Sequence, residues 1–186
     1  MVRIIAGTAR GRKIDTLEGM ETRPTLDRVK EAVFGSLQFR IPYAEVLDLF
    51  AGSGSLGLEA ISRGAKRAVF NDRNPQSAAT VRRNIETLGF GESTTVLNLD
   101  YAAAIERLSS EHAAFDLVFL DPPYREGLNG DVLRRLFEAH LVKPGGLAVL
   151  EHAAELAPAE LPGVYRVTRT KRFGKCGYSL IEEDGE

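Results

Sequence analysis

An acid, two prolines and a tyrosine stand together at residues 121–124, directly after an apolar segment. The first side chain and the next backbone carbonyl are hydrogen-bond acceptors, and the proline rings fix the direction of that carbonyl. The tyrosine adds a flat ring that could stack on a planar group. The same residues could simply end a strand, but together they could also hold one planar amine. The candidate catalytic residues are therefore Asp121, Pro122, Pro123 and Tyr124.

A glycine-rich segment, DLFAGSGSLG at residues 48–57, is suited to bind a ligand. Gly52 and Gly54 permit a sharp turn with no side chain in the way, and a following helix would begin with free N–H groups. The spacing formally matches the GxGxxG loop of dinucleotide-binding proteins. Asp48 is a poor neighbour for a pyrophosphate, however, and a favourable one for a cation. We therefore favour a ligand that carries a positive charge.

Further acids follow the next expected strands. Asp72 lies 18 positions after Gly54, where a carboxylate can accept the hydroxyl groups of a ribose. Asp100 and Asp121 end the two strands after that. Acids are also common at such junctions because they cap helices. Four of them beside a glycine loop indicate a ligand site, because the carboxyl ends of the strands form the binding edge of an open α/β sheet.

Alternating strand and helix patterns from residue 45 onward predict a parallel sheet with helices on both faces. The segments expected as strands are 46–50, 68–71, 95–99, 115–120 and, after a KPGG turn, 147–151. The segments expected as helices are 55–63, 74–88, 102–109 and 130–140. The glycine-rich connection between two final segments is so short that they must pair antiparallel; these are 164–172 and 178–182.

The first forty residues have a different character. The stretch IIAGTARGRKI predicts a hairpin around residues 7–11, and Thr25 can cap a helix. That helix would place four apolar residues on one face, namely Leu26, Val29, Val33 and Leu37. We expect residues 1–40 to form a basic hairpin and helix extension to a main domain over residues 41–186.

Composition excludes several classes of protein. The chain has 186 residues, 44% of them hydrophobic and 27% charged, which is ordinary for one globular domain with a small appendage. We expect a cytoplasmic protein without a membrane partner, because no apolar run is long enough to span a bilayer and no secretory signal is present. Cys176 is the single cysteine and the three histidines are isolated, so we expect no disulfide and no metal.

Charge is distributed unevenly along the chain, although the net charge is only −2. Residues 1–13 hold four basic side chains and no acid, and residues 164–180 hold five and no acid. Residues 41–163 hold 11 basic and 17 acidic side chains. One interpretation is that these basic side chains do no more than keep exposed strand edges from pairing. The other is that they bind phosphate groups.

The combined motifs resemble the class I S-adenosylmethionine-dependent methyltransferases. The resemblance covers residues 45–182 and rests on the D-x-F-A-G-S-G loop, the acids after the next two strands, and D-P-P-Y after the fourth. It implies a Rossmann-like α/β fold with a seven-stranded, mostly parallel sheet, an antiparallel terminal strand and helices on both faces. It also implies S-adenosylmethionine as the cofactor, S-adenosylhomocysteine as its product, and residues 41–186 as the methyltransferase domain.

The resemblance also suggests roles for single residues. Asp48 and residues 51–54 would hold the methionine part of the cofactor, Asp72 its ribose and Asp100 its adenine amino group. The DPPY turn would direct the lone pair of an amine at the methyl group, and its tyrosine would stack on a base flipped out of its surroundings. The candidate cofactor-binding residues are Asp48, Phe50, Ala51, Gly52, Ser53, Gly54, Asp72, Arg73, Asp100, Tyr101 and Thr25.

The amino-terminal segments narrow the resemblance. RIIAGTARGRKI followed by TRPTLDRVKEAVFGSL is similar to the RsmD family, bacterial methyltransferases of guanine N2 in small-subunit (16S) ribosomal RNA. This implies small-subunit ribosomal RNA as partner, within an assembled or assembling 30S subunit, and we expect a monomer. Arg23, Pro24 and Thr25 would line the edge of the cofactor site. Basic side chains would meet phosphates, and the candidates are Arg3, Arg10, Arg12, Lys13, Arg23, Arg28, Arg172 and Lys175.

The DPPY turn alone leaves the acceptor open, because adenine amines and glutamine amides suit it as well as guanine. An adenine-N6 methyltransferase of nucleic acid would give a different nucleoside. A glutamine methyltransferase would normally have asparagine in place of Asp121, and a non-catalytic ribosome-assembly factor would not depend on Asp121. Cys176 lies in the late basic segment, away from the expected rim, which argues against cysteine-based methylation of a pyrimidine carbon.

Overall fold

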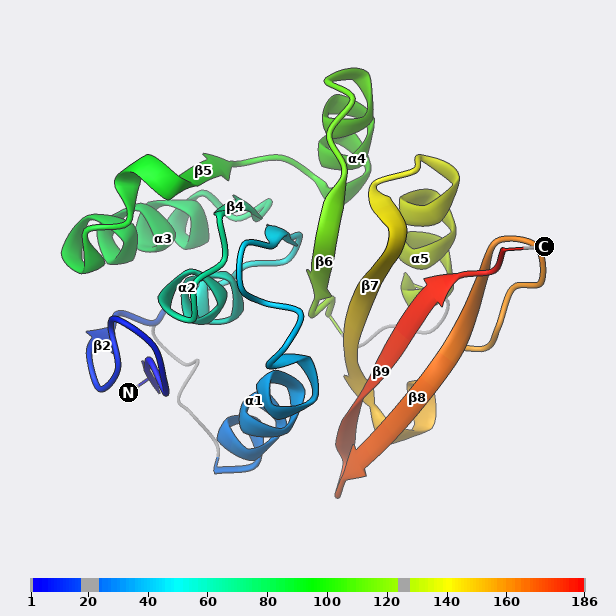
Figure 1. The fold of residues 1–186 in the computed structure, drawn as a ribbon, viewed down its shortest axis with the longest axis horizontal. Helices are drawn as coiled ribbons and strands as arrows, with labels where there is room; N and C mark the ends of the chain where they lie inside the picture. Colours follow the sequence, from blue (N-terminus) through cyan, green and yellow to red (C-terminus); the bar gives the residue numbers. More distant parts are fainter. Residues whose placement is uncertain (1, 18–23, 124–127, 186) are drawn as a thin grey trace.

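A seven-stranded sheet forms the centre of the molecule (Figure 1). The computed structural model describes residues 2–17, 24–123 and 128–185. The strand order is β5-β4-β3-β6-β7-β9-β8. The strands are β3 (Glu45–Asp48), β4 (Arg67–Asn71), β5 (Thr94–Leu97), β6 (Phe115–Leu120), β7 (Val142–Ala153), β8 (Tyr165–Phe173) and β9 (Cys176–Glu183).

Strand direction follows the sequence prediction. Strands β3 to β7 pair in parallel, and the last strand, β9, inserts antiparallel between β7 and β8. This confirms the predicted mostly parallel α/β sheet with an antiparallel terminal strand. The carboxyl ends of β3, β4, β6 and β7 therefore lie at one edge of the sheet.

Within the described ranges, five helices cover the two faces of the sheet. They are α1 (Pro24–Leu37), α2 (Ser55–Ser62), α3 (Pro75–Leu88), α4 (Tyr101–Ser110) and α5 (Leu128–Glu138), with short 3-10 turns at Gly91–Ser93 and Ala154–Leu156. Buried side chains of α1, α2 and α3 pack in one core, and those of α4 and α5 pack in another on the opposite face. Strand side chains alternate between the two cores, as Leu117 and Val118 do, because successive residues of a strand point to opposite faces.

Local signals explain several helix ends. The side chain of Asn74 accepts a hydrogen bond from the Gln76 N–H at the start of α3, where Pro75 takes the first position. Gly89 ends α3 with φ +75°, a conformation that glycine adopts without strain. Helix α1 already begins at Pro24, so the prediction that Thr25 caps it is wrong: the proline occupies the first turn instead.

The KPGG segment, at residues 143–146, differs from its prediction. It lies within β7 instead of forming a turn before the strand. Phe115 pairs with Val142 and Leu117 already pairs with Leu147, so the segment is accommodated as an irregularity in the register. Gly145, at φ +75°, supplies the backbone conformation that this bulge requires.

The chain begins with a small two-stranded sheet, in which β1 (Val2–Arg3) pairs antiparallel with β2 (Lys13–Ile14). Buried residues of this segment, Ile4, Ala9 and Ile14, join the core that α1, α2 and α3 share. The predicted hairpin is therefore packed onto the main body. Across the described ranges, no helix is long and apolar enough to cross a membrane.

Candidate active site

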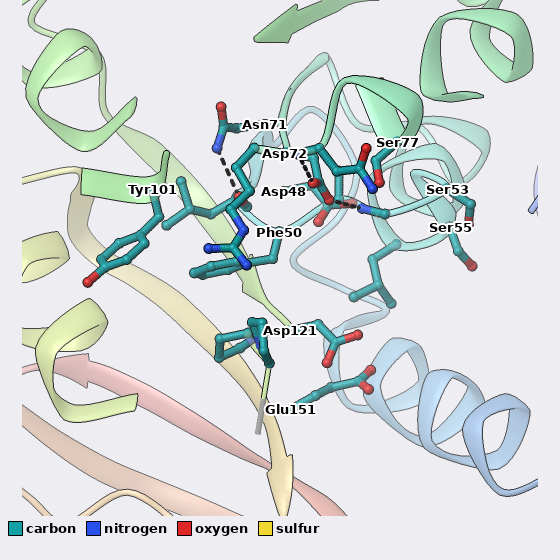
Figure 2. A pocket seen from close by; sticks show the side chains of 18 of the residues that line it. Asp48, Phe50, Ser53, Ser55, Asn71, Asp72, Ser77, Tyr101, Asp121 and Glu151 are labelled. Carbon is teal, nitrogen blue, oxygen red and sulfur yellow. Dashed lines mark hydrogen bonds between the residues drawn. The ribbon is translucent and has the colours of Figure 1, made fainter. Parts of the chain in front are cut away.

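A cavity of about 650 Å³ opens at the carboxyl ends of the parallel strands (Figure 2). Its volume lies within the range of small-molecule and cofactor sites. Most of the predicted site residues line it: Asp48, Phe50, Ala51, Gly52, Ser53, Asp72, Arg73, Asp100, Tyr101, Asp121, Pro122 and Pro123. Gly54 is buried behind the wall, at φ +82°, where it begins α2. Tyr124, Arg23 and the side chain of Thr25 lie outside what the structure describes.

Two of the predicted acids hold the glycine loop in place. The Asp48 carboxylate is buried and accepts a hydrogen bond from the Gly57 N–H at 2.9 Å. The Asp72 carboxylate accepts one from the Gly52 N–H at 2.8 Å and one from the Asn74 N–H at 2.8 Å. Each oxygen of a carboxylate can accept a second hydrogen bond, so Asp72 can both fix the loop and receive a ligand hydroxyl.

Asn71, which sequence reasoning missed, joins the loops that surround the cavity. Its side-chain amide donates to the carbonyls of Leu49, at 3.2 Å, and Leu99, at 3.1 Å. Its side-chain oxygen accepts from the Leu99 N–H at 3.2 Å. A buried asparagine at the end of a strand is a signal for such a role, because a buried amide requires partners.

One side of the cavity is formed by aromatic rings. Phe50 and Tyr101 lie with their ring centroids 5.7 Å apart, and the Tyr101 hydroxyl donates to Asp131 at 2.8 Å. The Asp100 side chain caps α4 by accepting from the Ala102 N–H at 3.0 Å. This part of the site thus combines an apolar wall with an exposed acid.

The acidic end of the cavity lies at the ends of β6 and β7. Leu120 pairs with Leu150 in register, so the next residues, Asp121 and Glu151, lie side by side. Figure 2 shows their carboxyl groups directed toward one another. Glu151 is only 8% exposed, and sequence reasoning missed it. The signal was available, because Glu151 ends an expected apolar strand in the same way as the other four acids.

Burial shifts the proton affinities of these acids. It raises the pKa of Asp48 to about 7, with smaller contributions from the charges of Asp121 and Asp72 and an opposing one from the Gly57 hydrogen bond. Asp121 keeps accessible surface because it faces the cavity, yet the surrounding protein displaces enough water to raise its pKa to about 6. Burial and the neighbouring charges of Asp121 and Asp48 raise the pKa of Glu151 well above its ordinary value, against the opposing charge of Lys30.

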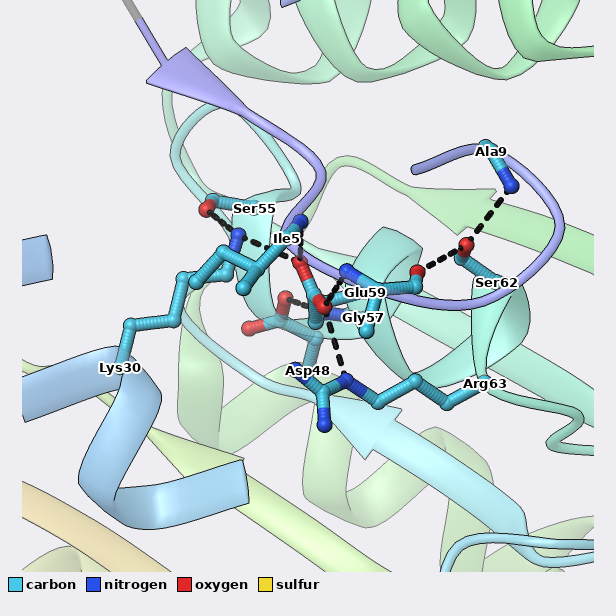
Figure 3. A network of polar contacts seen from close by, with 10 residues as sticks. Ile5, Ala9, Lys30, Asp48, Ser55, Gly57, Glu59, Ser62 and Arg63 are labelled. Carbon is cyan, nitrogen blue, oxygen red and sulfur yellow. Dashed lines mark hydrogen bonds and ion pairs between the residues drawn. The ribbon is translucent and has the colours of Figure 1, made fainter. Parts of the chain in front are cut away.

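The amino-terminal segment forms part of the cavity wall through Val2, Thr16 and Leu17. Figure 3 shows how the segment is anchored on the buried Glu59 of α2. That carboxylate accepts hydrogen bonds from the Ile5 N–H at 2.8 Å and the Ala6 N–H at 3.0 Å.

The same Glu59 carboxylate binds two cations. It forms ion pairs with Lys30 of α1 at 3.1 Å and with Arg63 at 2.8 Å. Lys30 also donates to the Ser55 hydroxyl at 2.8 Å and itself lines the cavity. One buried network therefore connects the amino-terminal segment, α1 and α2 at the edge of the site.

Those basic residues predicted to bind RNA that the structure describes lie outside the cavity. The described ones are all exposed, and they are Arg3, Arg10, Arg12, Lys13, Arg28, Arg172 and Lys175. The Arg12 guanidinium donates to the carbonyls of Thr87 and Leu88 at the end of α3. Cys176 is half-buried in β9 and does not line the cavity. No group of His, Cys, Asp or Glu side chains in the described part of the chain could hold a metal ion.

Comparisons with known proteins agree with this architecture. The Ribosomal RNA small subunit methyltransferase D of Haemophilus influenzae is 37% identical over 182 residues, covering 97% of this chain and 93% of the relative. The Escherichia coli K12 protein of the same name is 32% identical over 185 residues, covering 100% of this chain and 91% of that relative. The solved structure of the Escherichia coli protein yhhF matches with a TM-score of 0.88 and 32% identity over 100% of this chain and 99% of that one.

A more distant structure shows the same fold. It is a Thermus thermophilus 16S rRNA N2 methyltransferase (RsmC) in complex with AdoMet and guanosine, with a TM-score of 0.70 and 21% identity. The match covers 91% of this chain and 45% of the RsmC chain. The family described as Conserved hypothetical protein 95 matches residues 2–182. The chain therefore belongs to this family, the RsmD family, and has the class I methyltransferase fold.

Proposed function

We propose that this protein transfers a methyl group from S-adenosylmethionine to the exocyclic N2 amine of a guanine in small-subunit ribosomal RNA. The observation that carries the proposal is the convergence of Asp48, Asp72, Asp121 and the glycine loop on one cavity. The two relatives named as small-subunit ribosomal RNA methyltransferases, which align over more than nine-tenths of the chain, support the class of substrate.

The cavity residues suit the cofactor. A sulfonium cation is favoured by the surrounding carboxyl groups of Asp48 and Asp121. Asp72 can accept the ribose hydroxyls, and the exposed Asp100 can accept from an adenine amine beside the Phe50 and Tyr101 rings. When bound, S-adenosylmethionine supplies an electrophilic methyl group.

The turn after β6 suits the acceptor amine. Asp121 and the carbonyl of Pro122 can each accept one amine hydrogen, which draws these hydrogens out of the ring plane, takes the nitrogen lone pair out of conjugation with the ring and directs it at the methyl group. The new bond from nitrogen to carbon forms as the bond from carbon to sulfur breaks, so the reaction needs position and orientation above all. The amine then loses one proton, which the Asp121 carboxylate is placed to accept. Stacking by Tyr124 remains a prediction.

Methyl transfer can be tested with isotopically labelled S-adenosylmethionine. We expect label in small subunits that lack the N2-methylguanosine, less label in naked ribosomal RNA and none in DNA. An Asp121→Ala variant should be at least about 100-fold slower, because one of the two acceptors is gone. The variant should still bind S-adenosylhomocysteine, which separates loss of chemistry from loss of the fold. Cofactor binding without any transfer by the wild-type protein would contradict the proposal and favour a non-catalytic assembly factor.

A further inference from the structure

Glu151 occupies a position in the cavity that the proposed reaction does not yet use. It follows Leu150 on β7, and the register of β6 and β7 places it beside Asp121. Leu120 and Leu150 point into the core with α4 and α5, so Asp121 and Glu151 point to the opposite side, toward Lys30 and the cavity. Two carboxyl groups therefore face one end of the site (Figure 2).

No described residue donates a hydrogen bond to the Glu151 carboxyl group, which is accessible from the cavity although the residue as a whole is only 8% exposed. The nearby cation, Lys30, is hydrogen-bonded to Ser55 and paired with Glu59. A carboxyl group that is largely withdrawn from water and receives no donor in exchange costs stability, and a well-packed apolar residue would avoid that cost. Its side chain is thus available to accept a hydrogen bond from a bound molecule.

The edge of guanine offers such a donor next to its amine. Guanine presents an N1–H group beside its N2 amine, so both neighbouring groups donate hydrogen bonds. Adenine presents an unprotonated N1 beside its N6 amine, and this nitrogen accepts hydrogen bonds. A second carboxylate next to Asp121 therefore complements guanine and opposes adenine, because two acceptors repel each other.

We propose that Glu151 accepts the N1–H of the target guanine and is the residue that selects guanine over adenine. This inference rests on the proposed function, in which Asp121 and Pro122 hold the N2 amine. Glu151 must be ionised to exclude adenine, because a protonated carboxyl group could donate to the adenine N1. The charges that face it act in both directions: Asp121 and Asp48 oppose ionisation, whereas Lys30 favours it. The cationic cofactor adds a further charge that favours the carboxylate.

The test changes the side chain on one side of the proposed Glu151–guanine contact and the base on the other side. Glu151→Gln presents an amide that can donate to an unprotonated N1. The matching base is 2-aminopurine, which keeps the N2 amine but has an unprotonated N1. The guanine that the wild-type protein methylates is first mapped, and small subunits are then reconstituted from 16S RNA with guanine or 2-aminopurine at that position. For each pair of enzyme and base, kcat/KM is measured.

We expect the wild-type protein to prefer guanine by at least about 100-fold, because a buried acceptor without its donor is strongly disfavoured. Glu151→Gln should lower kcat/KM on guanine and reduce the guanine preference by at least about 30-fold, which corresponds to roughly 2 kcal/mol of discrimination. The missing O6 of 2-aminopurine affects both proteins equally, so it cancels in this comparison. Glu151→Asp retains a carboxylate and should retain the preference for guanine at a reduced rate.

The controls separate the possible failures. Glu155→Gln, an exposed substitution four positions away, should leave both substrates unchanged. Binding of S-adenosylhomocysteine and thermal unfolding show that each variant is folded. If the wild-type protein forms N2-methylguanosine but Glu151→Gln keeps the full guanine preference, the role of Glu151 is wrong and the proposed function stands. If the wild-type protein forms no N2-methylguanosine, the proposed function fails and this inference fails with it.

Discussion

At the scale of single residues, the carboxyl groups at the acidic end of the cavity lower the stability of the fold but are suited to bind the cofactor and the base. Asp48, Asp121 and Glu151 each have a raised pKa because water is withdrawn from them in the folded protein. Such groups ionise more readily when a cation or a hydrogen-bond donor arrives. We therefore expect substitution of Glu151, which receives no hydrogen bond from the loops, to change stability and activity in opposite directions.

Glu151→Gln should stabilise the protein while it impairs guanine methylation. The folded-state pKa of Glu151 is raised, so its carboxyl group destabilises the fold increasingly as pH rises above the unfolded-state value. The two proteins should be about equally stable near pH 4, and at about pH 8 the variant should be more stable by on the order of 1 kcal/mol. Urea unfolding at both pH values measures this difference. A variant that is less stable at the higher pH would indicate a structural role for the carboxylate.

The preference for the cationic cofactor should depend on pH. S-adenosylmethionine and S-adenosylhomocysteine differ by one methyl group and one positive charge. Asp121 and Asp48, with pKa values of about 6 and about 7, become negatively charged as pH rises. The affinity for S-adenosylmethionine relative to S-adenosylhomocysteine should therefore increase roughly tenfold from about pH 5.5 to about pH 8. Calorimetry with both ligands checks this, and a ratio that stays constant would show that these acids do not face the sulfonium.

Much of the site could be predicted from the residue types at the ends of the strands. Asp48, Asp72, Asp100 and Asp121 were expected at one edge, and all four line the cavity. Lys30 was missed because its role depends on contacts between distant segments, such as its pair with Glu59 and its hydrogen bond to Ser55. Those contacts exist only once the sheet and α1 are assembled, and no local spacing encodes them.

At the scale of elements, the amino-terminal segment is held by close backbone contact with α2. The Thr8 N–H donates to the Ser62 carbonyl at 2.8 Å, and the Ala9 N–H donates to the Ser62 hydroxyl at 2.9 Å. Gly7 passes so near that an added Cβ would lie 1.7 Å from the Ser62 carbonyl oxygen. The position thus needs glycine for its backbone conformation, φ +83°, and for space.

Gly7→Ala should detach this segment, and Gly11→Ala is its matched control. Both glycines have a left-handed backbone, but a Cβ on Gly11 would meet nothing within 4 Å. We expect Gly11→Ala to cost about 1 kcal/mol of unfolding free energy from backbone strain alone, and Gly7→Ala to cost at least about 2 kcal/mol. Trypsin should then cleave the Gly7→Ala variant faster at Arg10, Arg12 or Lys13. Equal effects of the two substitutions would contradict the close approach of Gly7 to Ser62.

Element types were predictable where the local signals agreed. The cap at Asn74, the proline after it and Gly89 marked both ends of α3. The KPGG segment was misassigned because proline and two glycines favour a turn, whereas pairing of β6 with β7 on both sides of the segment draws it into the strand. Tertiary pairing of this kind overrides turn propensity.

At the scale of the whole molecule, basic residues gather in two segments, residues 1–13 and residues 164–180. In Figure 1 the β1–β2 segment and the β8–β9 turn both lie on the side toward which β6 and β7 point. We propose that residues 1–40 extend the domain of residues 41–186 so that both basic ends meet RNA around the cavity. The exposed Arg10 and Lys13 are suited to bind phosphates, whereas Arg12 is engaged with the end of α3.

A double variant, Arg10→Ala with Lys13→Ala, should weaken binding to small subunits and reduce its salt dependence. Removing one basic side chain from a phosphate lowers the slope of log affinity against log salt by about 1. The control is Arg107→Ala with Arg134→Ala, which removes the same charge from α4 and α5, away from the β1–β2 segment and the β8–β9 turn (Figure 1). Filter binding over a salt series measures both slopes. Equal reductions in the two double variants would show that only net charge matters.

The proposed function depends above all on methylation of the N2 amine of guanine. The most direct measurement is nucleoside analysis by mass spectrometry of small-subunit RNA after reaction with labelled S-adenosylmethionine. We expect labelled N2-methylguanosine as the product of the wild-type protein, and none with Asp121→Ala. Labelled N6-methyladenosine in its place would contradict both the assignment of guanine and the role of Glu151.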